Sequence, residues 1–158
     1  MSRRVLAFAL LFATATSSGA SDTPRPVAKT IADMRTMAAA VESYALDHRR
    51  YPPTSDFSQL VGLLVSKYLL PDGPILDGWG APYKYLATPD GCHYRILSAG
   101  ADGVFEKANL AMSLSPPERR ASSRPSADIV FQDNAFQRVP AAASFALTLH
   151  EERLFSCP

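Results

Sequence analysis

The sequence predicts an α+β fold in which one long N-terminal amphipathic helix packs on a small antiparallel sheet of about three strands. Three observations predict it. The chain of 158 residues is 47% apolar, which suits one domain with its own core. An apolar stripe with helical spacing comes early in the chain, and short alternating segments separated by Gly- and Pro-rich turns follow it.

Residues 1–20 have the layout of a secretory signal peptide. Two arginines precede the apolar run 5–13, and small residues follow up to Ala20. The run is too short to span a bilayer, which takes about 20 apolar residues. We expect cleavage after Ala20, with an earlier alanine as a second choice and a retained membrane anchor as the alternative. Residues 21–158 would then form a single periplasmic or secreted domain without a further membrane span.

A helix is predicted over residues 27–49, because no Gly or Pro interrupts the pattern and alanines favour it. Its apolar stripe is Val27, Ile31, Met34, Ala38, Val41 and Ala45. Its polar face carries Lys29, Asp33, Arg35, Glu42 and Asp47. Pro52 and Pro53 end it.

A second, shorter helix follows an N-cap cluster at residues 54–56. Its apolar face is predicted to be Leu60, Leu63, Leu64 and Tyr68. Two turn clusters come next, at residues 71–74 and 77–82.

Three short strands are predicted, at residues 83–86, 92–98 and 128–131, with a hairpin-like turn at 89–91 between the first two. Residues 106–126 are polar and contain prolines, which predicts a long loop. The tail from residue 139 to 154 fits either a strand or a helix.

Charge and cysteine content exclude several classes of protein. The 16 basic and 15 acidic side chains nearly balance, which argues against a nucleic-acid binder. Two cysteines are too few for a four-cysteine zinc site. In an exported protein, Cys92 and Cys157 predict one disulfide. The alternative, Cys92 as a nucleophile beside His93, is weak because adjacent side chains on a strand point to opposite faces.

The order of these motifs resembles the globular domain of protein G, the major pseudopilin of the type II secretion system. The matching residues are Tyr51-Pro52, Asp77, Trp79-Gly80, Pro82-Tyr83, Tyr85, Ser98, Gly100, 101–103 and 127–129. They span about residues 28–131, which leaves 132–158 as a C-terminal extension. The chain departs from the family in lacking its short basic leader and long apolar helix, and in the length of the loop 104–127.

The resemblance implies a calcium site, because protein G pseudopilins bind calcium in the corresponding loop. The candidate ligands are the carboxylates of Asp102 and Asp128, the hydroxyl or carbonyl of Ser98, and the main chain of Leu97. Calcium takes six to eight oxygens of these kinds. On the residues alone, Asp102 caps a turn with Gly103 and Asp128 begins a strand.

The turn Asp77–Tyr83 is predicted to be structural: Gly78 and Gly80 allow positive φ, and Trp79 closes one end of the core. The alternative is an aromatic ligand-binding role for Trp79. No catalytic motif accompanies the three histidines or the serines. The predicted function is therefore non-catalytic: an exported protein that contacts components or cargo of a type II secretion system. The alternatives are a pseudopilus filament subunit with different N-terminal processing, and a periplasmic ligand-binding protein or enzyme on the same fold.

Overall fold

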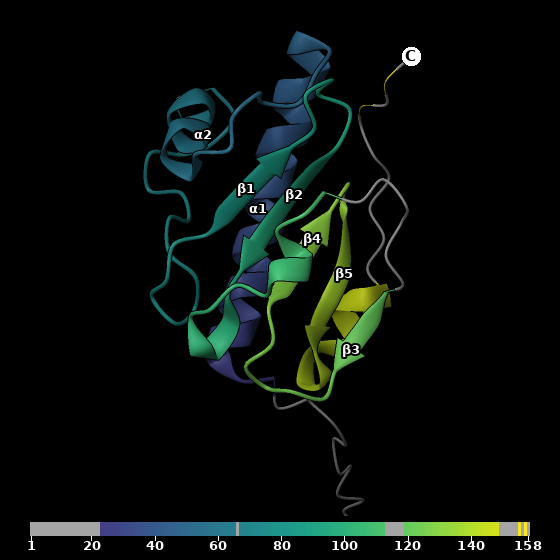
Figure 1. Ribbon diagram of the computed structural model, residues 1–158. Helices are drawn as coiled ribbons and strands as arrows, with labels where there is room; N and C mark the ends of the chain where they lie inside the picture. The colour runs from purple at the N-terminus through teal and green to yellow at the C-terminus, as the bar shows by residue number, and fades with distance from the viewer. Residues whose placement is uncertain (1–22, 66, 113–118, 149–154, 156, 158) are drawn as a thin grey trace, which may run out of the picture.

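The computed structural model describes residues 23–65, 67–112, 119–148, 155 and 157. The predicted signal peptide lies outside the described residues. The described part has the predicted α+β class, with a long helix and a five-stranded, mostly antiparallel sheet (Figure 1). None of its helices is both long enough and apolar enough to cross a membrane.

Helix α1 (Arg25–His48) confirms the predicted long helix. It begins with a proline in its first turn, where the missing N–H has no intrahelical acceptor to serve. It ends at His48, and the left-handed backbone of the C-cap residue Arg49 (φ 53°) redirects the chain. The predicted apolar stripe is its buried face. Glu42 was predicted on the polar face, but it is only 1% exposed, and its partners are described below.

Helix α2 (Phe57–Leu64) starts from the predicted cap. The Asp56 carboxylate accepts the N–H groups of Ser58 and Gln59. Leu60 and Leu64 are buried as predicted. Leu63 is 44% exposed and Tyr68 lies beyond the helix end, because just over two turns present only a narrow stripe to the core.

The sheet has the strand order β1-β2-β4-β5-β3. Its strands are β1 (Lys84–Ala87), β2 (Tyr94–Ser98), β3 (Arg120–Ser122), β4 (Ile129–Gln132) and β5 (Ala135–Pro140). The pairs β1–β2, β2–β4 and β4–β5 are antiparallel, and the edge strand β3 runs parallel to β5.

Five strands replace the predicted three, and the two additional strands were missed for different reasons. Strands β4 and β5 are joined by Asp133 and Asn134, which have φ values of 48° and 65°. A two-residue turn with both φ positive is a standard hairpin connection, and Asp and Asn are residue types that favour it. The Asp133-Asn134 pair was therefore a signal for the turn that the sequence already contained. Strand β3 has no strand pattern and lies in the predicted loop; its pairing with β5 defines it. Residues 132–140, expected to begin an extension, form the end of β4, the hairpin turn and β5.

Helix α1 lies across one face of the sheet (Figure 1). On that face Tyr94 and Ile96 of β2 and Phe131 of β4 join the buried stripe of the helix in one core. Arg95 and Gln132 alternate with these residues and so face the opposite side of the sheet, where both are also buried. Both faces of the central strands are therefore covered.

Three 3-10 helices complete the described fold: η1 (Gly100–Asp102), η2 (Lys107–Asn109) and η3 (Ala141–Thr148). The first two lie in the segment between β2 and β3, and η3 packs against β5 and β3. The predicted tail is thus strand up to Pro140 and, apart from a kink at Ala143, helical up to Thr148. Residues 149–154 of that tail lie outside the described residues.

Candidate functional site

The turn before β1 is organised by one buried carboxylate. Asp77 is 3% exposed. Its Oδ1 accepts the N–H groups of Trp79 (3.0 Å) and Ala81 (2.9 Å), and its Oδ2 accepts the hydroxyl of Ser98 at 2.6 Å. Both oxygens therefore have donors, and one of them links the turn to β2.

Glycine is needed twice in this turn, for different reasons. At Gly80 φ is 85°, as predicted. Gly78 does not use the positive φ that glycine allows. A Cβ added to Gly78 would lie 2.0 Å from the carbonyl oxygen of Pro26, and its N–H donates to Thr30 Oγ1 at 2.9 Å. The residue is small because the turn packs directly on the backbone of α1.

Two of the four predicted calcium ligands, Leu97 and Ser98, are fully buried in β2. The Ser98 hydroxyl donates to Asp77 and accepts the N–H of Gly100 at 3.2 Å. Leu97 pairs with strands on both sides and has only its main-chain oxygen to offer. The Ser98 side chain is thus engaged within the fold.

The other two predicted ligands are carboxylates in different surroundings. Asp102 is exposed, and its Oδ1 accepts the N–H of Val104 at 3.0 Å, which is the predicted turn cap. Asp128 is 1% exposed, and its Oδ2 accepts the N–H of Glu106 at 2.9 Å and the amide of Asn109 at 2.7 Å. Asp128 Oδ1 is buried with no hydrogen-bond partner among the described residues.

The segments that carry these two carboxylates touch each other. A Cβ added to Gly100 would lie 2.6 Å from the carbonyl oxygens of both Ser126 and Ala127. Within the described ranges, no group of three or more His, Cys, Asp or Glu side chains is arranged to hold a metal. The unpartnered Asp128 oxygen suits a hard cation, and the remaining ligands would be mainly carbonyls and water.

Arginines that the sequence analysis did not single out hold the loop after η1 on the sheet. Arg138 of β5 donates to Glu106 Oε2 at 2.6 Å, and Arg124 donates to the other oxygen of Glu106. Arg95, 3% exposed, donates to the carbonyl oxygens of Asn109 (2.8 Å) and Ala111 (2.7 Å).

Two pKa values reflect this arrangement. The hydrogen bond from Arg138 lowers the pKa of Glu106. Burial lowers the pKa of Arg95, whose guanidinium also donates to the side-chain oxygen of Gln132. In the sequence, single arginines in alternating segments look like ordinary solvated residues, so only the tertiary structure identifies this role.

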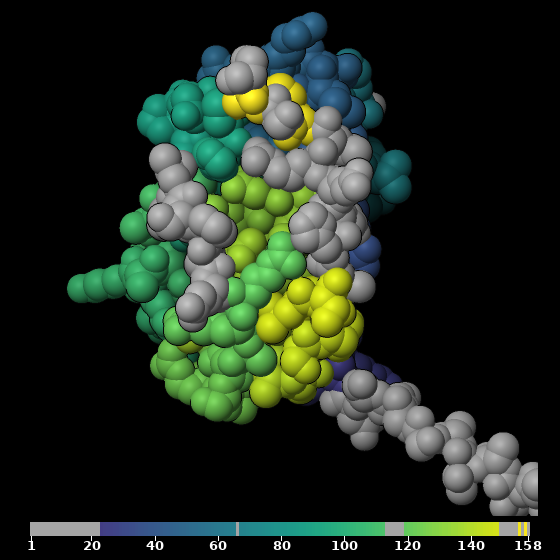
Figure 2. Space-filling model, turned by 90° about the vertical axis from the view of Figure 1, so that its right-hand side faces the viewer, coloured from purple at the N-terminus to yellow at the C-terminus, as the bar shows by residue number. Residues whose placement is uncertain are grey.

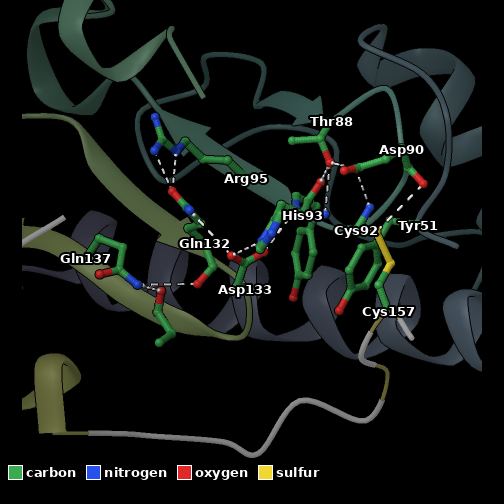
Figure 3. Close-up of polar contacts among 12 residues, drawn as sticks. Tyr51, Thr88, Asp90, Cys92, His93, Arg95, Gln132, Asp133, Gln137 and Cys157 are labelled. Atoms are coloured by element: carbon green, nitrogen blue, oxygen red, sulfur yellow. Dashed lines mark hydrogen bonds and ion pairs between the residues drawn. A yellow bond between two sulfur atoms is a disulfide. The ribbon is translucent and has the colours of Figure 1, made fainter. Parts of the chain in front are cut away.

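The predicted disulfide joins Cys92 to Cys157 across 65 positions, with the Cα atoms 5.5 Å apart (Figure 3). Because Cys92 is in this disulfide, it has no free thiol to act as the nucleophile that the alternative required. The ring of His93 instead faces Asp133 in Figure 3, with Nδ1 2.8 Å from Oδ2.

The family model of protein G of the type II secretion system matches residues 21–112. This range contains α1, α2, the Asp77 turn and the β1–β2 hairpin. The chain belongs to the protein G family. Asp128, Arg138 and Cys157 lie beyond the residues that match the family model.

A curated relative supports the same assignment. The chain is 34% identical over 80 residues to the type II secretion system core protein G of Pseudomonas aeruginosa. The aligned residues make up 45% of this chain and 56% of the relative, so the similarity spans little more than half of that protein. No solved structure matches the chain.

Proposed function

We propose that this protein serves type II secretion in the cell envelope through contacts with other secretion components or cargo, and without catalysis. The match of residues 21–112 to the protein G family carries the proposal. The packing of those residues supports it, because the family's Asp77 turn joins α1 to the sheet through Ser98 and Thr30. We therefore infer that the protein acts by presenting a surface to its partners.

Site-specific crosslinking tests the proposal directly. Large apolar side chains between α2 and β1 are exposed, among them Leu70 at 78% and Ile75 at 54%. A photocrosslinker at Leu70 is expected to capture secretion components identifiable by mass spectrometry, while one at Val104, 67% exposed on another loop, is the matched comparison. If neither position captures a secretion component and deletion leaves cargo secretion unchanged, the proposal fails.

The N-terminus of the processed protein distinguishes the proposed exported protein from the alternative, a filament subunit. Cleavage near Ala20 would leave a chain that starts close to α1, and it would support an exported protein that works without the family's apolar helix. An N-terminus upstream of the apolar run 5–13 would support the filament subunit instead. N-terminal sequencing of protein recovered from the envelope distinguishes them.

We further propose that calcium binds between the η1 loop and Asp128. The support is the buried Oδ1 of Asp128, which lacks a partner among the described residues, and the contact of Gly100 with residues 126–127. Asp102 and the main-chain oxygens of Leu97 and Ser98 would supply the other ligands. When bound, the ion would tie the loop to the sheet and stabilise the folded state by linkage. Thermal unfolding with calcium and with a chelator tests this, and equal midpoints would exclude the site.

A further inference from the structure

The described residues of the C-terminal tail return to the far end of α1 and cover an aromatic stack there. They form the small yellow group near the top of Figure 2, beside the blue segment that follows α1. The Phe155 ring is 9% exposed and meets Tyr51 edge-on, with the ring centroids 5.5 Å apart. Tyr51 packs in turn on Tyr94 at 4.6 Å. Phe155 thus closes one side of the core.

The main chain of Phe155 is bound as well as its ring. Its N–H donates to Glu42 Oε2 at 3.2 Å. The Tyr51 hydroxyl donates to Glu42 Oε1 at 2.9 Å, and the carbonyl oxygen of Phe155 is its second, longer acceptor at 3.3 Å. Because Glu42 is 1% exposed, losing the Phe155 donor would leave a buried carboxylate less well satisfied.

The disulfide anchors this contact on a turn that is itself tied to Tyr51. Cys157 lies two residues after Phe155 and is bonded to Cys92. The Tyr51 N–H donates to the carbonyl oxygen of Gly91 at 2.9 Å, and the Cys92 N–H donates to Asp90 Oδ1 at 2.9 Å. The covalent anchor and the binding site of Phe155 therefore belong to one block, which gives Phe155 a high effective concentration beside its site.

We propose that Cys92 and Cys157 form a redox latch: Phe155 docks on Tyr51 and Glu42 when the disulfide is formed, and leaves them when it is reduced. On closing, the two thiols lose two protons and two electrons, and one S–S bond forms. A disulfide-bearing oxidant takes them up and becomes two thiols. Such oxidants act outside the reducing cytosol. The latch therefore completes this end of the core after export. Only the statement that the protein is exported rests on the proposed function.

Reciprocal coupling gives the sharpest test. If docking of Phe155 favours the disulfide, removing the docked ring must make the disulfide easier to reduce by the same factor. In glutathione redox buffers, Phe155→Ala is expected to shift the oxidation equilibrium by roughly tenfold toward the thiols. The fraction oxidised is measured by mass after thiol alkylation. Phe145→Ala is the matched control, since Phe145 lies in η3 and is 43% exposed. Equal equilibria for Phe155→Ala and wild type would overturn the latch.

Hydrogen exchange on the full chain provides the second measurement. Reduction is expected to remove protection from the Phe155 amide while amides of β2 and β4 keep theirs. Protection of Phe155 after reduction would overturn the latch, because docking would then not need the disulfide. Simultaneous loss in β2 and β4 would overturn it too, because the disulfide would then support the whole fold. Both measurements use purified protein, so they are independent of whether crosslinking finds a secretion component.

Discussion

Two buried carboxylates flank the end of β2, and they differ in how fully they are satisfied. Both oxygens of Asp77 accept hydrogen bonds, two from its own turn and one from Ser98. Asp128 accepts two through Oδ2 and none through Oδ1 among the described residues. A carboxylate whose oxygens are all used serves the fold, whereas one with an unused buried oxygen retains the capacity to bind a ligand.

Removing the satisfied carboxylate should have the largest effect on stability. Asp77→Ala leaves the N–H groups of Trp79 and Ala81 and the hydroxyl of Ser98 without their acceptor. We expect a loss of about 3–5 kcal/mol in the free energy of unfolding, since each buried unsatisfied donor costs about 1–3 kcal/mol. Urea denaturation measures it. Asp72→Ala, at an exposed position, should change stability by about 0.5 kcal/mol or less. A loss as small for Asp77→Ala would contradict the assigned role.

Substitution of Gly78 tests the close approach of the Asp77 turn to α1. Gly78→Ala places a Cβ against the Pro26 carbonyl, and we expect it to cost about 2–3 kcal/mol through overpacking. Gly62→Ala is the matched control, because nothing lies within 4 Å of its added Cβ in α2. That change should stabilise by about 0.5–1 kcal/mol, since alanine favours a helix over glycine. Urea denaturation of both variants checks the opposite signs.

The proposed role of Asp128 Oδ1 in binding calcium can be tested with Asp128→Asn, which keeps the shape of the side chain. With calcium at a hundredfold excess over its Kd, wild-type protein should gain about 2.7 kcal/mol by linkage. Asp128→Asn should lose most of that gain, because the amide lacks the charge that a hard cation prefers. Thermal unfolding with calcium and with chelator measures the difference, and Asp72→Asn should behave as wild type. An undiminished gain in Asp128→Asn would place the ion elsewhere.

The smallest expected effect concerns the ion pair that holds the loop beside Asp128. The folded state lowers the pKa of Glu106 from its ordinary value of 4.5, first through the hydrogen bond from Arg138. The contribution of the Glu106 carboxylate to stability is therefore complete above pH 4.5 and disappears as the pH falls through the lower pKa of the folded state. Glu106→Gln should therefore cost about 0.5–1 kcal/mol at neutral pH and nothing in strong acid.

Denaturation of wild type and Glu106→Gln across this pH range checks the prediction. Arg138→Gln provides the control, because it removes the partner and should abolish the effect of the first substitution. A cost that persists unchanged at low pH would mean that Glu106 stabilises the loop by packing rather than by charge.

Local patterns predicted the parts of this protein that depend on near neighbours. The stripe of α1, the Asp56 cap and the hairpin at residues 89–91 involve residues a few positions apart, and all were confirmed. Cys92–Cys157 was also predicted, because an exported chain with two cysteines allows only one intramolecular pair. Strand β3 was missed because its three residues carry no pattern of their own.

The sequence predicted the carboxylates of the candidate site, but it did not predict the groups that hydrogen-bond to them. Asp102 caps its turn through Val104, two positions away, as its sequence context indicated. The donors to Asp128 and the arginines on Glu106 come from other elements, and nothing local marks them. Glu42 has an ordinary polar position on a helix, and it is buried where the distant Phe155 and Tyr51 contact it.

Periodicity, turn chemistry and cysteine count were enough to predict the α+β class, the long helix, the disulfide partners and the family's turn. Which polar groups are buried together depends on how distant segments pack, and local patterns do not predict it. Burial removes water as a partner, so each buried donor or acceptor depends on which distant segment packs against it. That packing made Asp77 a satisfied structural residue, left Asp128 with an unused oxygen, and placed Phe155 on Glu42.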